Sequence, residues 1–168
     1  STADALVKQA LEATESNLVE ARRITLALAP RELSTSRLPQ ALRSLCAGAE
    51  PFEISLTLTS ETLDLELAQE AALLRVAQSA LANVREHAGA SRVEVALTGE
   101  GGDAVLEIKD NGAGIAPDRA LAEGRGVGLR VMRARMSEIG GALEIASSSS
   151  GTTVTARTGV AGPVGVSA

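Results

Sequence analysis

Five short segments of the chain alternate apolar and polar residues, and four of them form two pairs joined by short turns. This period of two is typical of strands that bury one face. The segments cover residues 52–59, 92–98, 104–109, 142–147 and 152–157. The turns at Gly99–Gly102 and before Gly151 predict two antiparallel hairpins. Because the chain has so few strand–helix–strand units, a doubly wound parallel sheet is disfavoured.

Segments with helical periodicity lie between these strands. The clearest covers residues 68–88 and is stopped by Gly89. Two more are expected over 33–47, with a possible break at Pro39, and over 127–139. A mixture of helices and hairpins is typical of α+β domains. We therefore expect an α+β fold: a two-layer α/β sandwich in which helices cover one face of a mixed, mostly antiparallel sheet.

Residues 1–29 are predicted to form one long helix, which Pro30 ends because proline lacks an N–H and disfavours a helical residue before it. Its apolar stripe steps by four and three residues, which is the spacing of a coiled-coil seam. The stripe consists of Val7, Leu11, Thr14, Leu18, Ala21, Thr25 and Leu28. A lone helix cannot bury such a face. We expect either a dimerisation helix, which would make the chain self-associate, or a helix packed on its own domain.

The composition narrows the class of protein. Hydrophobic residues make up 45% and charged residues 22%, a globular balance that argues against wholesale disorder. A net charge of -5 and a single aromatic residue, Phe52, argue against a nucleic-acid partner. The lone Cys46 excludes an internal disulfide and fits a reducing compartment. No apolar run approaches the roughly 20 residues of a membrane span. The tail over residues 159–168 is expected to be disordered.

Three polar or glycine-rich spots fall at the ends of elements. The first, Asp110-Asn-Gly-Ala-Gly-Ile115, directly follows a strand. An aspartate there can accept a hydrogen bond from an exocyclic amine such as that of adenine, while Gly112 and Gly114 allow a flat ring to approach the backbone. Alone, the motif fits an ordinary turn better.

The second spot, Gly124-Arg-Gly-Val-Gly-Leu129, opens a helix, where free N–H groups attract anions and Arg125 adds a positive charge. It is not a Walker loop, because no Lys-Ser or Lys-Thr pair follows. The third is Asn83, whose amide oxygen can hold Mg²⁺ against phosphates, although an isolated asparagine on a helix is more often a plain surface residue. Thr152 can bring a hydroxyl to the same site, and His87 is expected as a polar residue at a helix end.

The order of these spots resembles the Bergerat ATP-binding fold shared by histidine kinases, DNA gyrase, Hsp90 and MutL. Two stretches narrow the resemblance to the short-lid sensor histidine kinases that work with helix-turn-helix response regulators. They are Leu74-Arg-Val-Ala-Gln-Ser-Ala-Leu-Ala-Asn-Val-Arg-Glu-His-Ala88 and Gly126-Val-Gly-Leu-Arg-Val-Met-Arg-Ala-Arg-Met136. The resemblance covers roughly Leu18 to Arg157, nearly the whole chain.

The resemblance implies roles for individual residues. Asn83 would hold the Mg²⁺, Asp110 would bind the adenine amine, and Gly112 and Gly114 would border the ring. Gly126 and Gly128 would line the phosphates at the end of a short lid over residues 116–125. The other residues expected to contact the nucleotide are His87, Ile115, Arg125, Val127, Leu129 and Thr152.

The resemblance also implies an organisation and a function. Residues 1–30 would be the second helix of a dimerisation and phosphoacceptor domain, and 31–158 the ATP-binding catalytic domain. The cofactors would be ATP and Mg²⁺, and the partners a second copy of the protein and a response regulator. The location would be cytoplasmic, either in a free protein or in the cytoplasmic part of a membrane-anchored sensor. The domain would transfer the ATP γ-phosphate to a histidine on a dimerisation helix.

The sequence departs from the family pattern at two points. The phosphoacceptor histidine belongs on a first dimerisation helix, and since no such helix precedes Ser1 and His87 does not match it, the chain is expected to be a fragment. Ser79 stands where the family usually has an acidic catalytic residue, one turn before Asn83. A serine is no general base at neutral pH. The alternative is a degenerate nucleotide-binding or scaffold module, whereas the short lid and the missing acid disfavour an ATPase of the gyrase and Hsp90 type.

Overall fold

The computed structural model describes residues 2–48, 50–59, 63–100, 103–115 and 125–159, and of these it describes no side chain at 15, 16, 18–28, 100 and 125. Helices and strands alternate along the chain much as the periodicity predicts. The elements are α1 (Thr2–Leu28), η1 (Arg31–Ser34), α2 (Leu38–Ala47), β1 (Glu53–Leu58), α3 (Leu67–Asn83), η2 (Val84–Ala88), β2 (Arg92–Glu100), β3 (Asp103–Asp110), α5 (Arg125–Glu138), β4 (Ala142–Ser148) and β5 (Gly151–Arg157).

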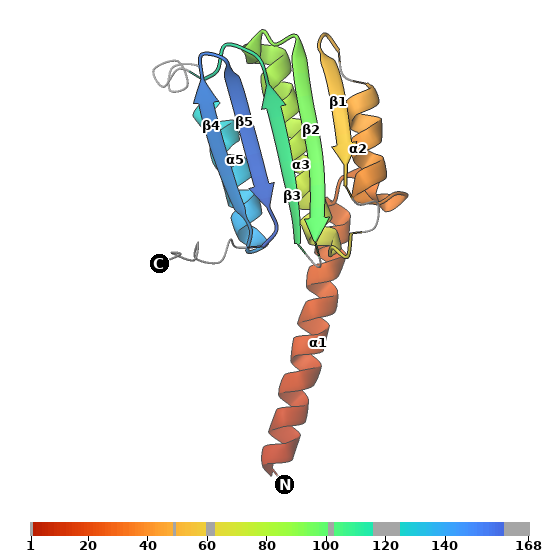
Figure 1. Ribbon diagram of the computed structural model, residues 1–168. Coiled ribbons are helices and arrows are strands. Elements are labelled where there is room, and N and C mark those ends of the chain that lie inside the picture. Colours follow the sequence, from red (N-terminus) through yellow and green to blue (C-terminus); the bar gives the residue numbers. More distant parts are fainter. Residues whose placement is uncertain (1, 49, 60–62, 101–102, 116–124, 160–168) are drawn as a thin grey trace, which may run out of the picture.

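The five strands form one mixed sheet in the order β1-β2-β3-β5-β4. Only β1 and β2 pair in parallel, and the pairs β2–β3, β3–β5 and β4–β5 are antiparallel. Helices α2, α3 and α5 lie on one face of this sheet (Figure 1). The predicted α+β fold and both predicted hairpins are therefore confirmed.

The core lies between the sheet and these helices. Alternate residues of β3 and β5 are buried, as expected for strands that turn one face to helices and the other to water. Aliphatic side chains and methionines fill the core, and Phe52 is its only aromatic member among the described residues. The largest fully buried side chains are Leu38, Leu42, Leu73, Leu74, Leu81, Leu97, Leu106, Met132, Met136, Val76, Val93 and Val95.

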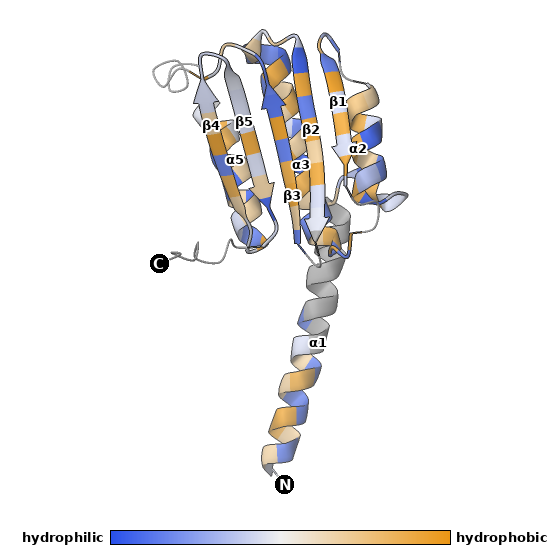
Figure 2. Cartoon of the chain, viewed as in Figure 1, coloured by the Kyte–Doolittle hydropathy of each residue, from blue (hydrophilic) through white to orange (hydrophobic). Residues whose placement is uncertain are grey.

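Helix α1 extends away from the sheet (Figure 1). Val7 and Leu11 of the apolar stripe are 60% exposed and Leu6 beside them is 62% exposed, so the outer part of the stripe is not covered by its own domain. Figure 2 shows apolar and polar residues side by side along this outer part. The exposed stripe argues against a helix packed along its whole length on its own domain, and the dimerisation helix stays a prediction. None of the described helices has the length and apolar character needed to cross a membrane.

The segment after α1 differs from its prediction. Instead of one helix over 33–47, the chain forms the short 3-10 helix η1 and then α2, which begins at Leu38. Pro39 lies in the first turn of α2, where its missing N–H leaves no helical hydrogen bond unmade. The helical stretch is therefore divided at residues 35–37 rather than at the possible break, Pro39, because this proline lies in a first helical turn.

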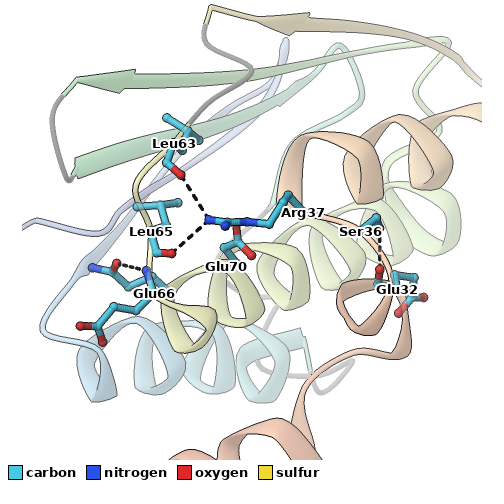
Figure 3. Close-up of polar contacts among 8 residues, drawn as sticks. Glu32, Ser36, Arg37, Leu63, Leu65, Glu66 and Glu70 are labelled. Carbon is cyan, nitrogen blue, oxygen red and sulfur yellow. Dashed lines mark hydrogen bonds and ion pairs between the residues drawn. The ribbon is translucent and has the colours of Figure 1, made fainter.

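Arg37 joins the start of α2 to the start of α3. Its Nε lies 2.7 Å from Oε1 of Glu70, which is only 3% exposed. Its Nη2 donates to the carbonyl oxygens of Leu63 (3.2 Å) and Leu65 (3.3 Å). Figure 3 shows this guanidinium reaching all three partners. A buried carboxylate needs such a partner, because an unpaired charge in the interior is costly.

We predict that Arg37→Ala lowers the free energy of unfolding by about 2–4 kcal/mol, because it leaves Glu70 buried without its ion pair. The loss is smaller than for a fully buried pair, since the Arg37 side chain is 64% exposed. Urea unfolding measures it. Arg133→Ala on α5 is the control, because Arg133 is exposed and makes no ion pair with a described residue. Equal unfolding midpoints for the two variants would contradict the role of Arg37.

Candidate nucleotide-binding site

A pocket opens between the end of α3 and the adjoining ends of β3 and β5. It holds about 530 Å³ of empty space, part of it open to solvent. Seven of the residues predicted from the sequence line it: Asn83, His87, Asp110, Gly114, Ile115, Leu129 and Thr152. The remaining walls are apolar and consist of Ala80, Val84, Ala88, Ile108 and Val154.

Asp110 and Thr152 are the buried polar residues of the pocket lining, and Asp110, at the end of β3, is 7% exposed. Its Oδ1 accepts a hydrogen bond from the N–H of Gly112 at 2.8 Å. Its Oδ2 accepts no hydrogen bond from any residue that the structure describes. Buried polar atoms are rarely left without a partner. The free oxygen therefore marks a position where a ligand N–H fits.

Asn111 holds the turn that follows Asp110. Its Oδ1 accepts the N–H groups of Ser91 (3.0 Å) and Arg92 (2.9 Å), and its Nδ2 donates to Oγ of Ser91 (2.9 Å). This asparagine thus ties the end of β3 to the start of β2. This function of Asn111 could not be predicted from the sequence, because an Asp-Asn-Gly sequence signals a turn without indicating what the turn contacts.

Close contacts within the chain explain why Gly112 and Gly114 of the Asp110–Ile115 motif carry no side chain. A Cβ on Gly112 would collide with the carbonyl oxygen of Ala88, and the next residue, Ala113, donates its N–H to that oxygen at 3.0 Å. Gly114 has a φ of +74° and lies against the carbonyl of Ser148. Gly112 therefore lies behind the pocket, whereas Gly114 forms part of its wall.

The helix that carries Asn83 does not continue as a regular α-helix. Residues Val84–Ala88 form a π-helical turn, which Gly89 ends with a φ of +59°. Asn83, Val84, His87 and Ala88 all line the pocket. π-Turns of this kind occur often at functional sites, and nothing in the helical periodicity predicts this one.

Asn83 and His87 differ in their surroundings. The Asn83 side chain makes no hydrogen bond with a described residue, and a Cβ on Gly128 would lie 3.9 Å from its Oδ1. The first turn of α5 therefore faces this amide. His87 has Nε2 3.5 Å from Oε2 of Glu86, a long contact to a side chain that is 66% exposed. This contact fits the expected polar residue at a helix end.

Several predicted site residues do not line the pocket. Ser79 is partly buried on α3 one turn before Asn83, and Val127 is 55% exposed at the start of α5. Gly126 and Gly128 lie in the same first turn as Val127, and space around a Cβ at Gly126 is open. The Arg125 side chain, lid residues 116–124 and tail residues 160–168 lie outside the described residues. The roles expected of these residues stay predictions.

The described residues contain no group of three or more His, Cys, Asp or Glu that could hold a metal ion. A magnesium site here would therefore rest on one amide oxygen, with phosphate and water as the other ligands, which is a common arrangement for Mg²⁺ bound to nucleotides.

Burial raises the pKa of the Cys46 thiol to about 11, which keeps it protonated and unreactive at neutral pH.

The family model of the histidine kinase-, DNA gyrase B- and HSP90-like ATPases matches residues 68–161. The chain belongs to this family. The matched region begins within α3 and includes the pocket, from Asn83 through Asp110 to Thr152. The resemblance predicted from the sequence is confirmed at this level, while membership of the short-lid subfamily stays a prediction.

Similar proteins are sensor kinases from several bacteria. The chain is 39% identical over 154 residues to sensor histidine kinase MctS of Rhizobium johnstonii, covering 89% of this chain and 33% of MctS. It is 34% identical over 134 residues to signal transduction histidine-protein kinase/phosphatase UhpB of Salmonella typhimurium, covering 74% of this chain and 25% of UhpB. The chain thus spans a third or less of the length of these two curated relatives.

Solved structures with the same fold are also histidine kinases. The kinase domain of the Erythrobacter litoralis blue-light activated histidine kinase matches with a TM-score of 0.57 at 19% identity, over 72% of this chain and 60% of that one. Histidine kinase AdeS of Acinetobacter baumannii matches with a TM-score of 0.52 at 22% identity, over 91% of this chain and 83% of that one. At such identities the likeness shows the fold alone, and that fold is the predicted one.

Proposed function

We propose that this domain binds ATP with Mg²⁺ and transfers the γ-phosphate to a histidine on a dimerisation helix, for relay to a response regulator. The observation that carries the proposal is that Oδ2 of Asp110 has no hydrogen-bond partner among the described residues, in a pocket whose walls are largely apolar. The family match and the sensor kinase relatives support the same activity.

Adenine matches the chemistry of the pocket. Its exocyclic amine can donate an N–H to Oδ2 of Asp110, and its flat ring suits the walls formed by Val84, Ile108 and Val154. The hydroxyl of Thr152 lies on the strand next to Asp110 and offers a second polar contact. Most of the binding free energy would come from apolar contact, while the polar groups would select the base.

The phosphates would extend from the base toward Asn83 and the first turn of α5. Free N–H groups at a helix start attract phosphate, and glycines leave room for it. Asn83 would hold the Mg²⁺ through its side-chain oxygen, which has no partner among the described residues. When bound, the ion neutralises phosphate charge.

Phosphotransfer would form a bond between an imidazole nitrogen and the γ-phosphorus, break the bond from that phosphorus to its bridging oxygen, and release ADP. The acceptor histidine would lie on a separate helix, because His87 lies inside the pocket wall. Ser79 offers no carboxylate to orient the imidazole or take its proton. This observation favours a second candidate function, a module that binds ATP without productive transfer.

We predict that Asp110→Asn weakens ATP binding by about 1–3 kcal/mol, because an amide N–H can replace the acceptor that faces the adenine amine. Isothermal titration calorimetry with ATP and Mg²⁺ measures the affinity. Asp103→Asn is the matched control, because Asp103 is exposed at the other end of β3. Equal affinities for wild type and Asp110→Asn would remove Asp110 from the site and with it the main support of the proposal.

We predict that Ser79→Glu raises phosphotransfer to a supplied dimerisation domain by up to about 10²–10⁴-fold, the usual contribution of a positioned general base. ATP affinity should stay unchanged, and Ser79→Gln, which has no charge, should show no gain. Strong transfer by the wild type that the substitution does not improve would show that the base lies elsewhere. Absence of transfer from every form, with ATP still bound, would favour the binding module.

A further inference from the structure

Strand β4 turns Leu143, Ile145 and Ser147 toward the same face of the sheet, because side chains alternate along a strand. Leu143 and Ile145 pack against the core, whereas the third position carries a hydroxyl. Ser147 pairs directly with Thr152 of β5. The register between β3 and β5 pairs Lys109 with Thr153, which brings Asp110 beside Thr152. Three polar side chains thus end three neighbouring strands in one row.

The Ser147 hydroxyl links two walls of the pocket. Its Oγ accepts the N–H of Ile115 at 2.7 Å and lies 3.1 Å from Oγ1 of Thr152. Ile115 and Thr152 both line the pocket, and Thr152 is only 8% exposed. Ser147 itself is exposed and lies outside the lining. Its position therefore suits it to act through the two residues that it contacts.

We propose that Ser147 is a positioning residue for the nucleotide base, an inference that rests on the proposed function. Its oxygen accepts from Ile115. The contact between the Ser147 and Thr152 hydroxyls allows either one to donate, and we assign Ser147 as the donor, which leaves the Thr152 hydrogen for the ligand. A donor at Thr152 beside an acceptor at Asp110 matches a ring nitrogen beside an amino group. Ser147 thus sets the hydrogen-bond polarity of the wall that contacts the base.

The experiment is a calorimetric titration of four forms of the chain with ATP and Mg²⁺, and with ADP without Mg²⁺. Ser147→Ala is expected to weaken both ligands by about three- to tenfold, the effect of one hydrogen bond. The losses should be equal, because Ser147 acts at the base and not at the phosphates. Ser147→Thr, which keeps the hydroxyl, should restore affinity. Ser149→Ala, in the exposed turn after β4, should bind as the wild type does.

A double-mutant cycle with Thr152→Val separates positioning from simple loss of structure. If Ser147 acts through Thr152, Ser147→Ala costs less affinity in the Thr152→Val background than in the wild type. An undiminished loss there, or a Ser147→Ala variant that binds as the wild type does, would overturn the inference and leave the proposed function standing. Failure of the wild type to bind either nucleotide would overturn the proposed function as well.

Discussion

The turn after β3 has to fit against two other parts of the chain at once, and the pocket depends on that fit. On one side, Gly112 lies against the carbonyl of Ala88 and Ala113 donates to it, so the turn is fixed to the end of η2. On the other side, a Cβ at Gly151 would collide with the carbonyl of Asp110, so the start of β5 lies equally close. Only glycine permits both approaches without displacing backbone.

The same region marks the end of the apolar core. The inward-facing residues of β3 are aliphatic at Leu106 and Ile108 and then polar at Asp110. Those of β5 change in the same way from Val154 to Thr152, and the next strand ends its apolar series at Ser147. A sheet whose inward side chains become polar in one row cannot continue to pack against aliphatic helices. It forms a site whose walls are apolar and whose end is polar.

Much of this fold could be predicted from local patterns, since each of its strands has a period of two in the sequence. The glycine predicted to stop the long helix, Gly89, does end it, with a φ of +59°. Asp110 was predicted to belong to the site because its motif directly follows a strand. It does line the pocket. The contacts of Asn111 and Ser147 that hold the pocket could not be predicted, because their partners, Ser91 and Ile115, are distant in sequence. Such contacts leave no periodic signal.

The segment from Pro30 to Leu38 shows a different limit of prediction from the sequence. Its helix start was misplaced because Pro39 fits both a break and a first turn, and the choice depends on tertiary contacts such as that of Arg37 with Glu70. The π-turn after Asn83 is a comparable case. One additional residue in a helical turn alters which side chains reach the pocket, yet it does not change the apolar pattern of the helix.

We propose that a nucleotide base binds between η2 and the ends of β3 and β5. The most direct test is a nuclear magnetic resonance titration of the isotope-labelled chain with ADP, followed through its backbone amide signals. The largest shifts are predicted at Gly112, Gly114, Ile115 and Thr152, with small changes along the open face of the sheet at Glu94 and Glu107. Shifts centred on that open face or on α1, with the turn after β3 unaffected, would contradict binding of the base in this pocket.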